Sequence, residues 1–306
     1  MYFPFIKYRR IFYLISAILV VLSLASIFVF GLKGSIDFSG GSSLEVLFKN
    51  EPPSFEEIRK SLEGLDLGEI SFQKTGERGI TLRTKEVSEE LHQQILERLK
   101  SLGEIEEGSE SFQNIGSLIG REMKNKTKVV IFLSLAGLLI YVAVSFRKLS
   151  RTVKSYIYGF TAIIALCHDI IIPLGVLAVL GRLKGVEITI PIITAFLTVF
   201  GYSINDTVVV YDRIRENVLK RKTSDFGMVI EQSINQTLTR SINTVLTVLI
   251  SLLAIFFFGG ETLRYFSLSL IIGISCGCYS SIFIAAPLVF TYYKFREKRQ
   301  KKNRQE

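Results

Sequence analysis

The sequence predicts a polytopic α-helical membrane protein with six transmembrane helices and a ferredoxin-like α/β domain between the first two. Two observations support this prediction. Hydrophobic residues make up 48% of the chain and charged residues 21%, but the charges are nearly absent from several long apolar runs. A hydrocarbon core about 30 Å thick needs about 20 apolar residues of helix, which is the length of these runs. The second observation is a stretch of mixed composition after the first run, long enough for one small domain.

Six runs qualify as spans, and they divide the chain into an N-terminal segment, a first helix, a domain, a five-helix bundle and a basic tail. The expected boundaries are 1–10 for the N-terminal segment, 11–31 for the first helix, 32–127 for the domain, 128–293 for the bundle and 294–306 for the tail. Within the bundle the spans are expected at 129–146, 156–180, 188–211, 242–258 and 265–292.

The positions of the basic residues predict the orientation. Twenty Lys and Arg residues lie before the first span, in alternate loops and in the tail, whereas the remaining short loops hold only three. The positive-inside rule then places both termini in the cytoplasm and residues 32–127 outside. Because topology accounts for the net charge of +9, nucleic acid is not expected as a partner.

The pattern of the exported segment predicts the order βαββαβ, the split βαβ arrangement of ferredoxin-like domains. Alternating apolar residues indicate strands, and Ser54 with Glu57 forms a capping box at the start of a helix. The expected strands are 36–49, 69–74, 79–85 and 105–112, and the expected helices are 54–65 and 88–103. Many unrelated proteins share this fold, so it predicts a rigid contact domain and no particular activity.

Asp206 is the first candidate functional residue, because it lies inside the fourth expected span. A charge at the centre of a span costs about 2.5 to 3.5 kcal/mol on the translocon scale, so such residues usually face a bundle interior or a water-filled path. The alternative is a carboxylate that reaches the cytoplasmic surface near Asp212 and Arg213.

Arg240, at the start of the fifth span, is the expected partner of Asp206. Burial favours a neutral carboxyl group and a nearby guanidinium favours a charged one, so movement of the partner would change the protonation of Asp206. This is the basis for a prediction of proton coupling. Polar side chains at helical spacing are expected to support the pair, from Tyr202 and Asn205 in the fourth span and from Asn243, Thr244 and Thr247 in the fifth.

His168 and Asp169 in the third span are a second, weaker candidate for a proton relay, although a buried His-Asp step is more often structural. No metal site is expected, because no Cys or carboxylate cluster at ligand spacing accompanies them. An enzyme is not expected either, since His168 is the only histidine in the spans and no Walker A or dinucleotide-binding loop is present. Small residues at every fourth position of the last span, from Ser269 to Ala285, predict close helix packing.

Two motifs carry a resemblance to a known family. Residues 37–42 read DFSGGS and resemble the Asp-Phe-Thr-Gly-Gly-Thr motif that opens the exported domain of SecD and SecF proteins, with serine at two threonine positions. Residues 201–217, GYSINDTVVVYDRIREN, are similar to the fourth-span signature of SecF proteins nearly residue for residue. Gly40 and Gly41 would serve the turn that follows Asp37, since glycine permits unusual backbone angles.

The resemblance covers essentially the whole chain and implies half of an RND-type bundle in the cell (inner) membrane. It implies SecD, the SecYEG translocon, preproteins and membrane lipid as partners, and no cofactor. It also implies use of the proton motive force in late steps of preprotein export. The family's intramembrane aspartate and arginine map onto Asp206 and Arg240. These are the two residues selected above from the free-energy cost of a charge in a span and from the helical spacing of the polar residues.

Two other functions remain open from the residues alone. An RND-like exporter of small molecules or lipids would use the same buried carboxylate, but it would need a larger exported region with an apolar pocket. A passive scaffold that stabilises the translocon would need no proton site.

Overall fold

A computed structural model of the chain describes residues 3–145, 155–220 and 225–303. The expected end of the second span at Phe146, the basic segment 147–154 and part of the basic loop after the fourth span lie outside the described residues, as do both extreme ends of the chain. The chain forms two compact units, one of residues 1–31, 130–179 and 191–306 and the other of residues 32–129 and 180–190. We call them the bundle unit and the sheet unit.

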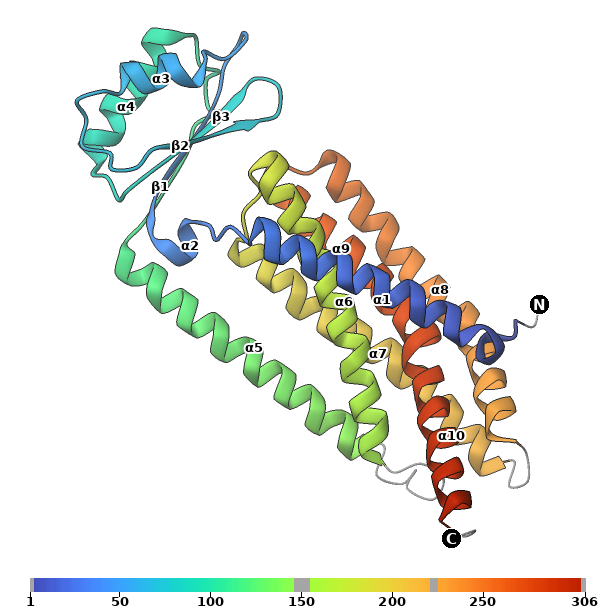
Figure 1. The fold of residues 1–306 in the computed structure, drawn as a ribbon. Helices are drawn as coiled ribbons and strands as arrows, with labels where there is room; N and C mark the ends of the chain where they lie inside the picture. The colour runs from blue at the N-terminus through green and yellow to red at the C-terminus, as the bar shows by residue number, and fades with distance from the viewer. Residues whose placement is uncertain (1–2, 146–154, 221–224, 304–306) are drawn as a thin grey trace. The chain divides into compact units, whose positions relative to one another are not determined.

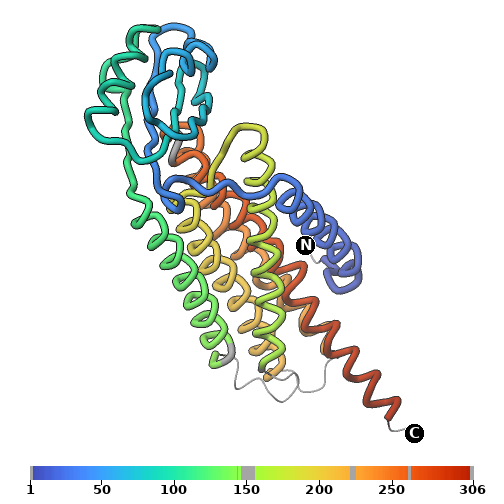
Figure 2. The backbone as a smooth tube through the Cα atoms, turned by 60° about the vertical axis from the view of Figure 1, so that its left-hand side comes forward, coloured from blue at the N-terminus to red at the C-terminus, as the bar shows by residue number. Residues whose placement is uncertain are grey.

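Six apolar helices are long enough to cross a membrane within the described residues, which confirms the predicted fold class. The last of the six is one continuous helix that contains a π-helical turn (Figure 2). The helices are α1 (Phe5–Phe30), α5 (Ser117–Ser145), α6 (Ser155–Lys184), α7 (Ile190–Lys220), α8 (Phe226–Phe258), and the run of α9 (Glu261–Ser280), the π turn (Ser281–Ala285) and α10 (Ala286–Lys302).

Several helices extend beyond the apolar runs from which the spans were predicted. The helix α5 begins at Ser117, well before the first apolar residue of its run, and α7 continues to Lys220. Side-chain pairs three or four residues apart support the polar end of α7, where Glu216 pairs with Arg213 and with Lys220. Hydropathy therefore locates a span but not the ends of its helix.

The sheet unit contains a four-stranded antiparallel sheet in the order β2-β3-β1-β4, with two helices on one face (Figure 1). Because β3 lies between β1 and β2, the topology is the predicted split βαβ arrangement. The core between sheet and helices includes Leu44, Val46, Ile58 and Leu99. The elements are β1 (Gly41–Leu47), α3 (Phe55–Ser61), β2 (Ser71–Thr75), β3 (Gly79–Thr84), α4 (Glu89–Leu102) and β4 (Ser111–Ile115).

The capping box predicted at the start of α3 is present. The Ser54 hydroxyl accepts a hydrogen bond from the Glu57 backbone N–H at 3.3 Å, and the Glu57 carboxylate accepts one from the Ser54 N–H at 2.8 Å. These bonds lower the pKa of Glu57, since they favour its charged form.

Two strand predictions were wrong at their ends. Residues 36–39 form a helical turn, α2 (Ile36–Ser39), in place of the start of a strand. The Ser35 hydroxyl caps this turn, and Gly40, at a φ of 75°, ends it. The predicted strand 105–112 is interrupted by a turn in which the Ser109 N–H donates to the Glu106 carbonyl, so Ile105 forms only an isolated bridge and β4 begins at Ser111.

Small residues allow the helices of the bundle unit to approach closely. A Cβ atom on Gly175 of α6 would lie 2.4 Å from Ser23 Cβ of α1, and one on Gly273 of α9 would lie 2.5 Å from Val199 Cγ2 of α7. The predicted small-residue ladder therefore lies at the contact between α9 and α7. The helix α6 also contains Pro173, which has no N–H to donate to the carbonyl of Asp169 one turn earlier.

The contact at Gly273 leads to a prediction for stability. Gly273→Ala is expected to destabilise the protein by about 1 to 3 kcal/mol, because the new methyl group meets a valine whose side chain has little rotational freedom. Gly201→Ala is the control, since a Cβ there meets no atom within 4 Å. Thermal unfolding of the purified protein in detergent measures both variants, and equal midpoints would contradict the close contact between α7 and α9.

Candidate functional site

Asp206 lies on the face of α7 that meets α8 and α9, inside the bundle unit. Its Oδ1 atom accepts a hydrogen bond of 2.5 Å from the Ser241 hydroxyl of α8. Its Oδ2 atom is buried and has no hydrogen-bond partner within residues 3–145, 155–220 and 225–303. A buried carboxylate oxygen without a donor costs free energy, so this atom is a natural site for a proton or a water molecule.

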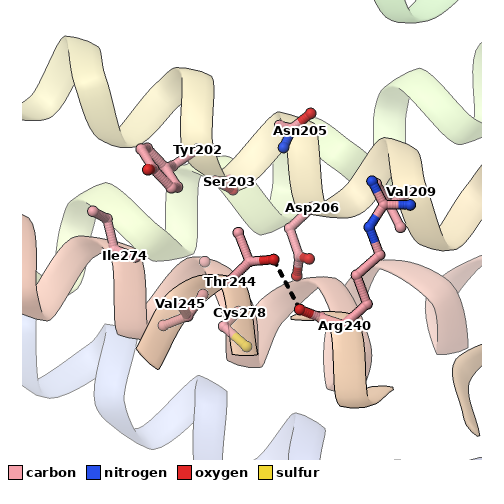
Figure 3. A pocket seen from close by; sticks show the side chains of 11 residues that line it. Tyr202, Ser203, Asn205, Asp206, Val209, Arg240, Thr244, Val245, Ile274 and Cys278 are labelled. Atoms are coloured by element: carbon pink, nitrogen blue, oxygen red, sulfur yellow. Dashed lines mark hydrogen bonds between the residues drawn. The ribbon is translucent and has the colours of Figure 1, made fainter. Parts of the chain in front are cut away.

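A cavity of about 60 Å³ adjoins the Asp206 carboxylate (Figure 3). This volume is sufficient for water molecules, and its wall includes the polar groups that ordered water requires. The lining residues come from α7, α8 and α9: Tyr202, Ser203, Asn205, Asp206, Val209, Arg240, Thr244, Val245, Ile274, Gly277 and Cys278. The structure thus places Asp206 in the bundle interior, as the cost of its charge predicts.

Arg240 lines the same cavity, but it does not form an ion pair with Asp206 among the described residues. Its side chain extends past the carboxylate toward Val209 (Figure 3). The predicted pair therefore shares a cavity without direct contact. A second cavity of about 230 Å³ is also lined by Val209 and Arg240, together with Asp212, Arg213 and Glu216. The arginine side chain lies where the two cavities adjoin.

The predicted supporting residues divide into two groups. Tyr202, Asn205 and Thr244 line the cavity, whereas Asn243 and Thr247 do not belong to its wall. The Thr247 hydroxyl donates to the Thr244 carbonyl within α8 instead, which is how hydroxyl side chains satisfy themselves in a helix. Of the residues predicted on α8, Thr244 thus belongs to the cavity wall, and a supporting role for it stays a prediction.

Sequence analysis missed Ser241, which donates a hydrogen bond of 2.5 Å to the Asp206 carboxylate. Ser241 is fully buried and directly follows Arg240. The sequence feature that could have identified Ser241 is its hydroxyl group directly beside Arg240, a residue predicted to be functional. Ser203 and Gly277 also contribute to the wall, and a Cβ on Gly277 would lie 3.2 Å from Ser203 Cβ.

His168 and Asp169 form a separate buried polar cluster between α6, α7 and α9. Asp169 is fully buried, and its Oδ1 lies 2.9 Å from His168 Nδ1. Its Oδ2 accepts hydrogen bonds from the hydroxyls of Ser203 at 2.6 Å and Ser280 at 2.7 Å. Three partners satisfy this carboxylate and link three helices, which fits a structural role, and the proton relay stays a prediction.

The Asp169 cluster and the Asp206 cavity are neighbours, because Ser203 and Asp206 lie about one helical turn apart on α7. Ser203 donates to Asp169 and also lines the Asp206 cavity. One turn further, Thr207 shares a hydrogen bond of 2.9 Å with Ser281, the neighbour of Ser280. His168 Nε2 is buried without a partner among the described residues. Ser203 is therefore the residue that links the Asp169 cluster to the wall of the Asp206 cavity.

The structure also excludes one enzyme motif that the sequence contains. Residues 273–277, GISCG, match the Gly-x-Ser-x-Gly string of the hydrolase nucleophile elbow. That motif needs a sharp strand-to-helix turn, but here it lies within α9, and the Ser275 hydroxyl donates to the Ile271 carbonyl. In the described residues, no group of three or more His, Cys, Asp or Glu side chains has the geometry of a metal site.

The third predicted group, the motif turn of Asp37, Gly40 and Gly41, belongs to the sheet unit. Asp37 lies in α2, and both glycines have positive φ angles, 75° and 121°. A Cβ on Gly41 would lie 2.7 Å from the Thr84 carbonyl oxygen, so backbone conformation and space both require glycine there.

Comparisons with known proteins agree on one family. The family described as "Protein export membrane protein SecD/SecF, C-terminal" matches residues 94–295. The protein translocase subunit SecF of Thermobaculum terrenum is 40% identical over 94% of this chain and 93% of its own length. The SecF subunit of Synechocystis is 33% identical over 95% of this chain and 94% of its own length.

A solved structure gives the same result. The crystal structure of SecDF from Thermus, titled a translocon-associated membrane protein, has a TM-score of 0.82 and 32% identity, covering 96% of this chain. The chain spans only 39% of the length of that SecDF chain. The names of the relatives describe a subunit of a transport machine and not a classical enzyme. The chain therefore belongs to the SecD/SecF family of protein export membrane proteins, as a SecF-type subunit of multi-pass topology with a role in protein translocation.

Proposed function

We propose that this chain works with SecD to couple the proton motive force to late steps of preprotein translocation through SecYEG. It does so in the inner membrane with both termini in the cytoplasm, where the basic loops would lie. The observation that carries the proposal is the buried Asp206 carboxylate, whose Oδ2 has no hydrogen-bond donor among the described residues and which faces a cavity large enough for water.

The geometry supports binding and release of a proton at Asp206. Loss of the proton leaves a charged carboxylate that accepts a hydrogen bond from Ser241, while Arg240 lies in the same cavity wall. Approach of the guanidinium would favour the charged form, and its withdrawal would favour the neutral form. One charge crossing 100 mV carries about 2.3 kcal/mol, enough to shift a two-state equilibrium between helix arrangements.

His168 and Asp169 would extend this site as a proton relay through Ser203, which donates to Asp169 and lines the Asp206 cavity. The three hydrogen bonds to Asp169 support a structural role equally well. Proton uptake by vesicles distinguishes the two roles. A relay requires Asp169→Asn to slow proton uptake while the protein keeps its thermal stability, whereas a purely structural residue would lower stability first.

The proposed function predicts a dependence on the proton gradient. In vesicles that contain this chain with SecD and SecYEG, an imposed gradient is expected to accelerate completion of export several-fold, and a protonophore is expected to abolish the acceleration. Vesicles without this chain are the control. The scaffold alternative predicts the same stimulation by the chain with and without a gradient.

The exporter alternative needs a ligand pocket in the exported region. A larger, mainly apolar cavity of about 570 Å³ lies on α5, α6 and α10 of the bundle unit, lined by residues that include Leu139, Phe160 and Ile163, and so does not belong to the sheet unit where an exporter of this kind would bind its ligand. Lipid release from the same vesicles at a rate that depends on this chain would favour the exporter over the translocation role.

A further inference from the structure

The connection between α6 and α7 packs with the sheet unit. Residues 180–190 belong to that unit and not to the bundle unit. The Ile188 N–H donates to the Lys33 carbonyl at 2.7 Å, and the Ser35 N–H donates to the Ile188 carbonyl at 3.0 Å, which forms a short parallel bridge. The segment immediately before α7 is therefore paired with the segment immediately before the motif turn.

Side chains of the sheet add two more contacts to this connection. Arg83 of β3 forms an ion pair with Glu187, and both side chains are largely buried, with 23% and 13% of their surfaces exposed. Gln73 of β2 donates from Nε2 to the Lys184 carbonyl at 3.1 Å. Burial raises the pKa of Glu187, and the nearby Arg83 opposes this effect. Removal of either partner would leave the other charge largely buried without a counter-charge, which costs free energy.

The motif residue Asp37 makes the contact that reaches α7 itself. Its Oδ2 atom accepts a hydrogen bond of 2.9 Å from the backbone N–H of Ile190, the first residue of that helix. The first N–H groups of a helix have no partner within the helix, and the helix dipole favours a negative charge there. Asp37 thus caps α7 from a position 153 residues away in the sequence.

The turn that carries Asp37 is itself held tightly. The Ser35 hydroxyl donates to the same Asp37 Oδ2 at 2.9 Å. A Cβ on Gly40 would lie 2.6 Å from Ser117 Cα, and one on Gly120 would lie 2.6 Å from the Gly40 nitrogen. The backbone of the motif therefore packs directly on the first turn of α5, and the Asp37 side chain has little freedom to move away from α7.

We propose that Asp37 is a positioning residue that attaches Ile190, the first residue of α7, to the rest of the sheet unit, with the pair of Arg83 and Glu187 as the second attachment. The helix attached in this way carries Asp206, so a displacement of α7 on proton binding would be transmitted to the exported domain at these contacts. The transmission rests on the proposed proton-coupled function, whereas the attachment itself does not.

The first experiment tests the cap in the full-length protein. Asp37→Ala is expected to increase hydrogen exchange in the first turn of α7 about fivefold or more and to reduce gradient-driven export by a similar factor. Asp37→Asn keeps an acceptor oxygen and is expected to restore most of both. Equal loss in the two variants, or unchanged exchange in Asp37→Ala, would overturn the capping role.

The second experiment tests the ion pair by charge exchange. Arg83→Glu and Glu187→Arg are each expected to lower gradient-driven export several-fold, and the double variant is expected to recover most of it. Lys85→Glu is the matched control, because Lys85 pairs with the exposed Asp66 within the sheet unit and does not reach residues 184–190. A double variant as poor as the single ones would contradict the attachment.

Failure of this proposal and failure of the proton mechanism give different results. If protonophore has no effect on export but Asp37→Ala still increases exchange in α7, the attachment is correct and the proton mechanism is wrong. If export depends on the gradient but is unchanged in Asp37→Ala and in both charge variants, the transmission proposed here is wrong.

Discussion

Asp206→Asn is expected to reduce gradient-driven export at least about tenfold without unfolding the protein. Asparagine keeps an Oδ1 acceptor for the Ser241 hydroxyl, so the hydrogen bond between α7 and α8 remains. What is lost is the group that binds a proton. Because one charge across 100 mV carries about 2.3 kcal/mol, loss of this coupling is a large effect on the rate. Export in reconstituted vesicles, with and without an imposed gradient, measures it.

A matched control uses another carboxylate of the same region. Asp225 lies at the start of α8, where it is exposed and makes no capping hydrogen bond. Asp225→Asn is therefore expected to leave gradient-driven export unchanged. Normal export by Asp206→Asn would show that the proton is bound elsewhere, and Asp169 would then be the next residue to test.

Arg240→Met is expected to cause a loss of similar size, for a different reason. Methionine fills much of the same space but removes the guanidinium that lines the Asp206 cavity. The charged form of the carboxylate then lacks a nearby positive group, so proton release becomes unfavourable. Arg240→Lys keeps the charge without the planar guanidinium, and it is expected to retain part of the activity.

The interdependence of the two residues is measurable. Arg215→Met is the control, since Arg215 pairs with Asp212 and does not line the cavity. If Asp206 and Arg240 act as one unit, the double variant Asp206→Asn with Arg240→Met is expected to be no worse than either single variant. Losses that multiply in the double variant would show that Arg240 acts independently of Asp206.

The parts of this site that sequence analysis predicted are those that carry a large physical cost. A charged carboxylate in an apolar span costs free energy, so Asp206 can be identified from the sequence. Arg240 can be identified for the same reason, because it is a charged residue at the start of the next polar stripe. Ser241 was missed because a hydroxyl costs little in a helix, where it can bond to its own backbone. Its neighbour Thr244 does so, donating to the Arg240 carbonyl.

The contacts of residues 184–190 with the rest of the sheet unit were not predictable from the sequence for a geometric reason. Arg83 and Glu187 are 104 residues apart, and Asp37 and Ile190 are 153 residues apart. Neither pair has a local pattern, because the contacts exist only after the connection between two spans folds against the domain. The glycines of the motif were recognised as turn residues, but their contact with Ser117 and Gly120 depends on the same tertiary packing.

Pro173 gives α6 a point of low bending stiffness beside its buried carboxylate. The carbonyl of Asp169 receives no intrahelical hydrogen bond from position 173, so bending the axis there breaks one bond fewer than elsewhere. The Asp169 side chain is tied to Ser203 and Ser280 on two other helices. Any bending of α6 at this proline would therefore act on the hydrogen bonds from Asp169 to α7 and α9.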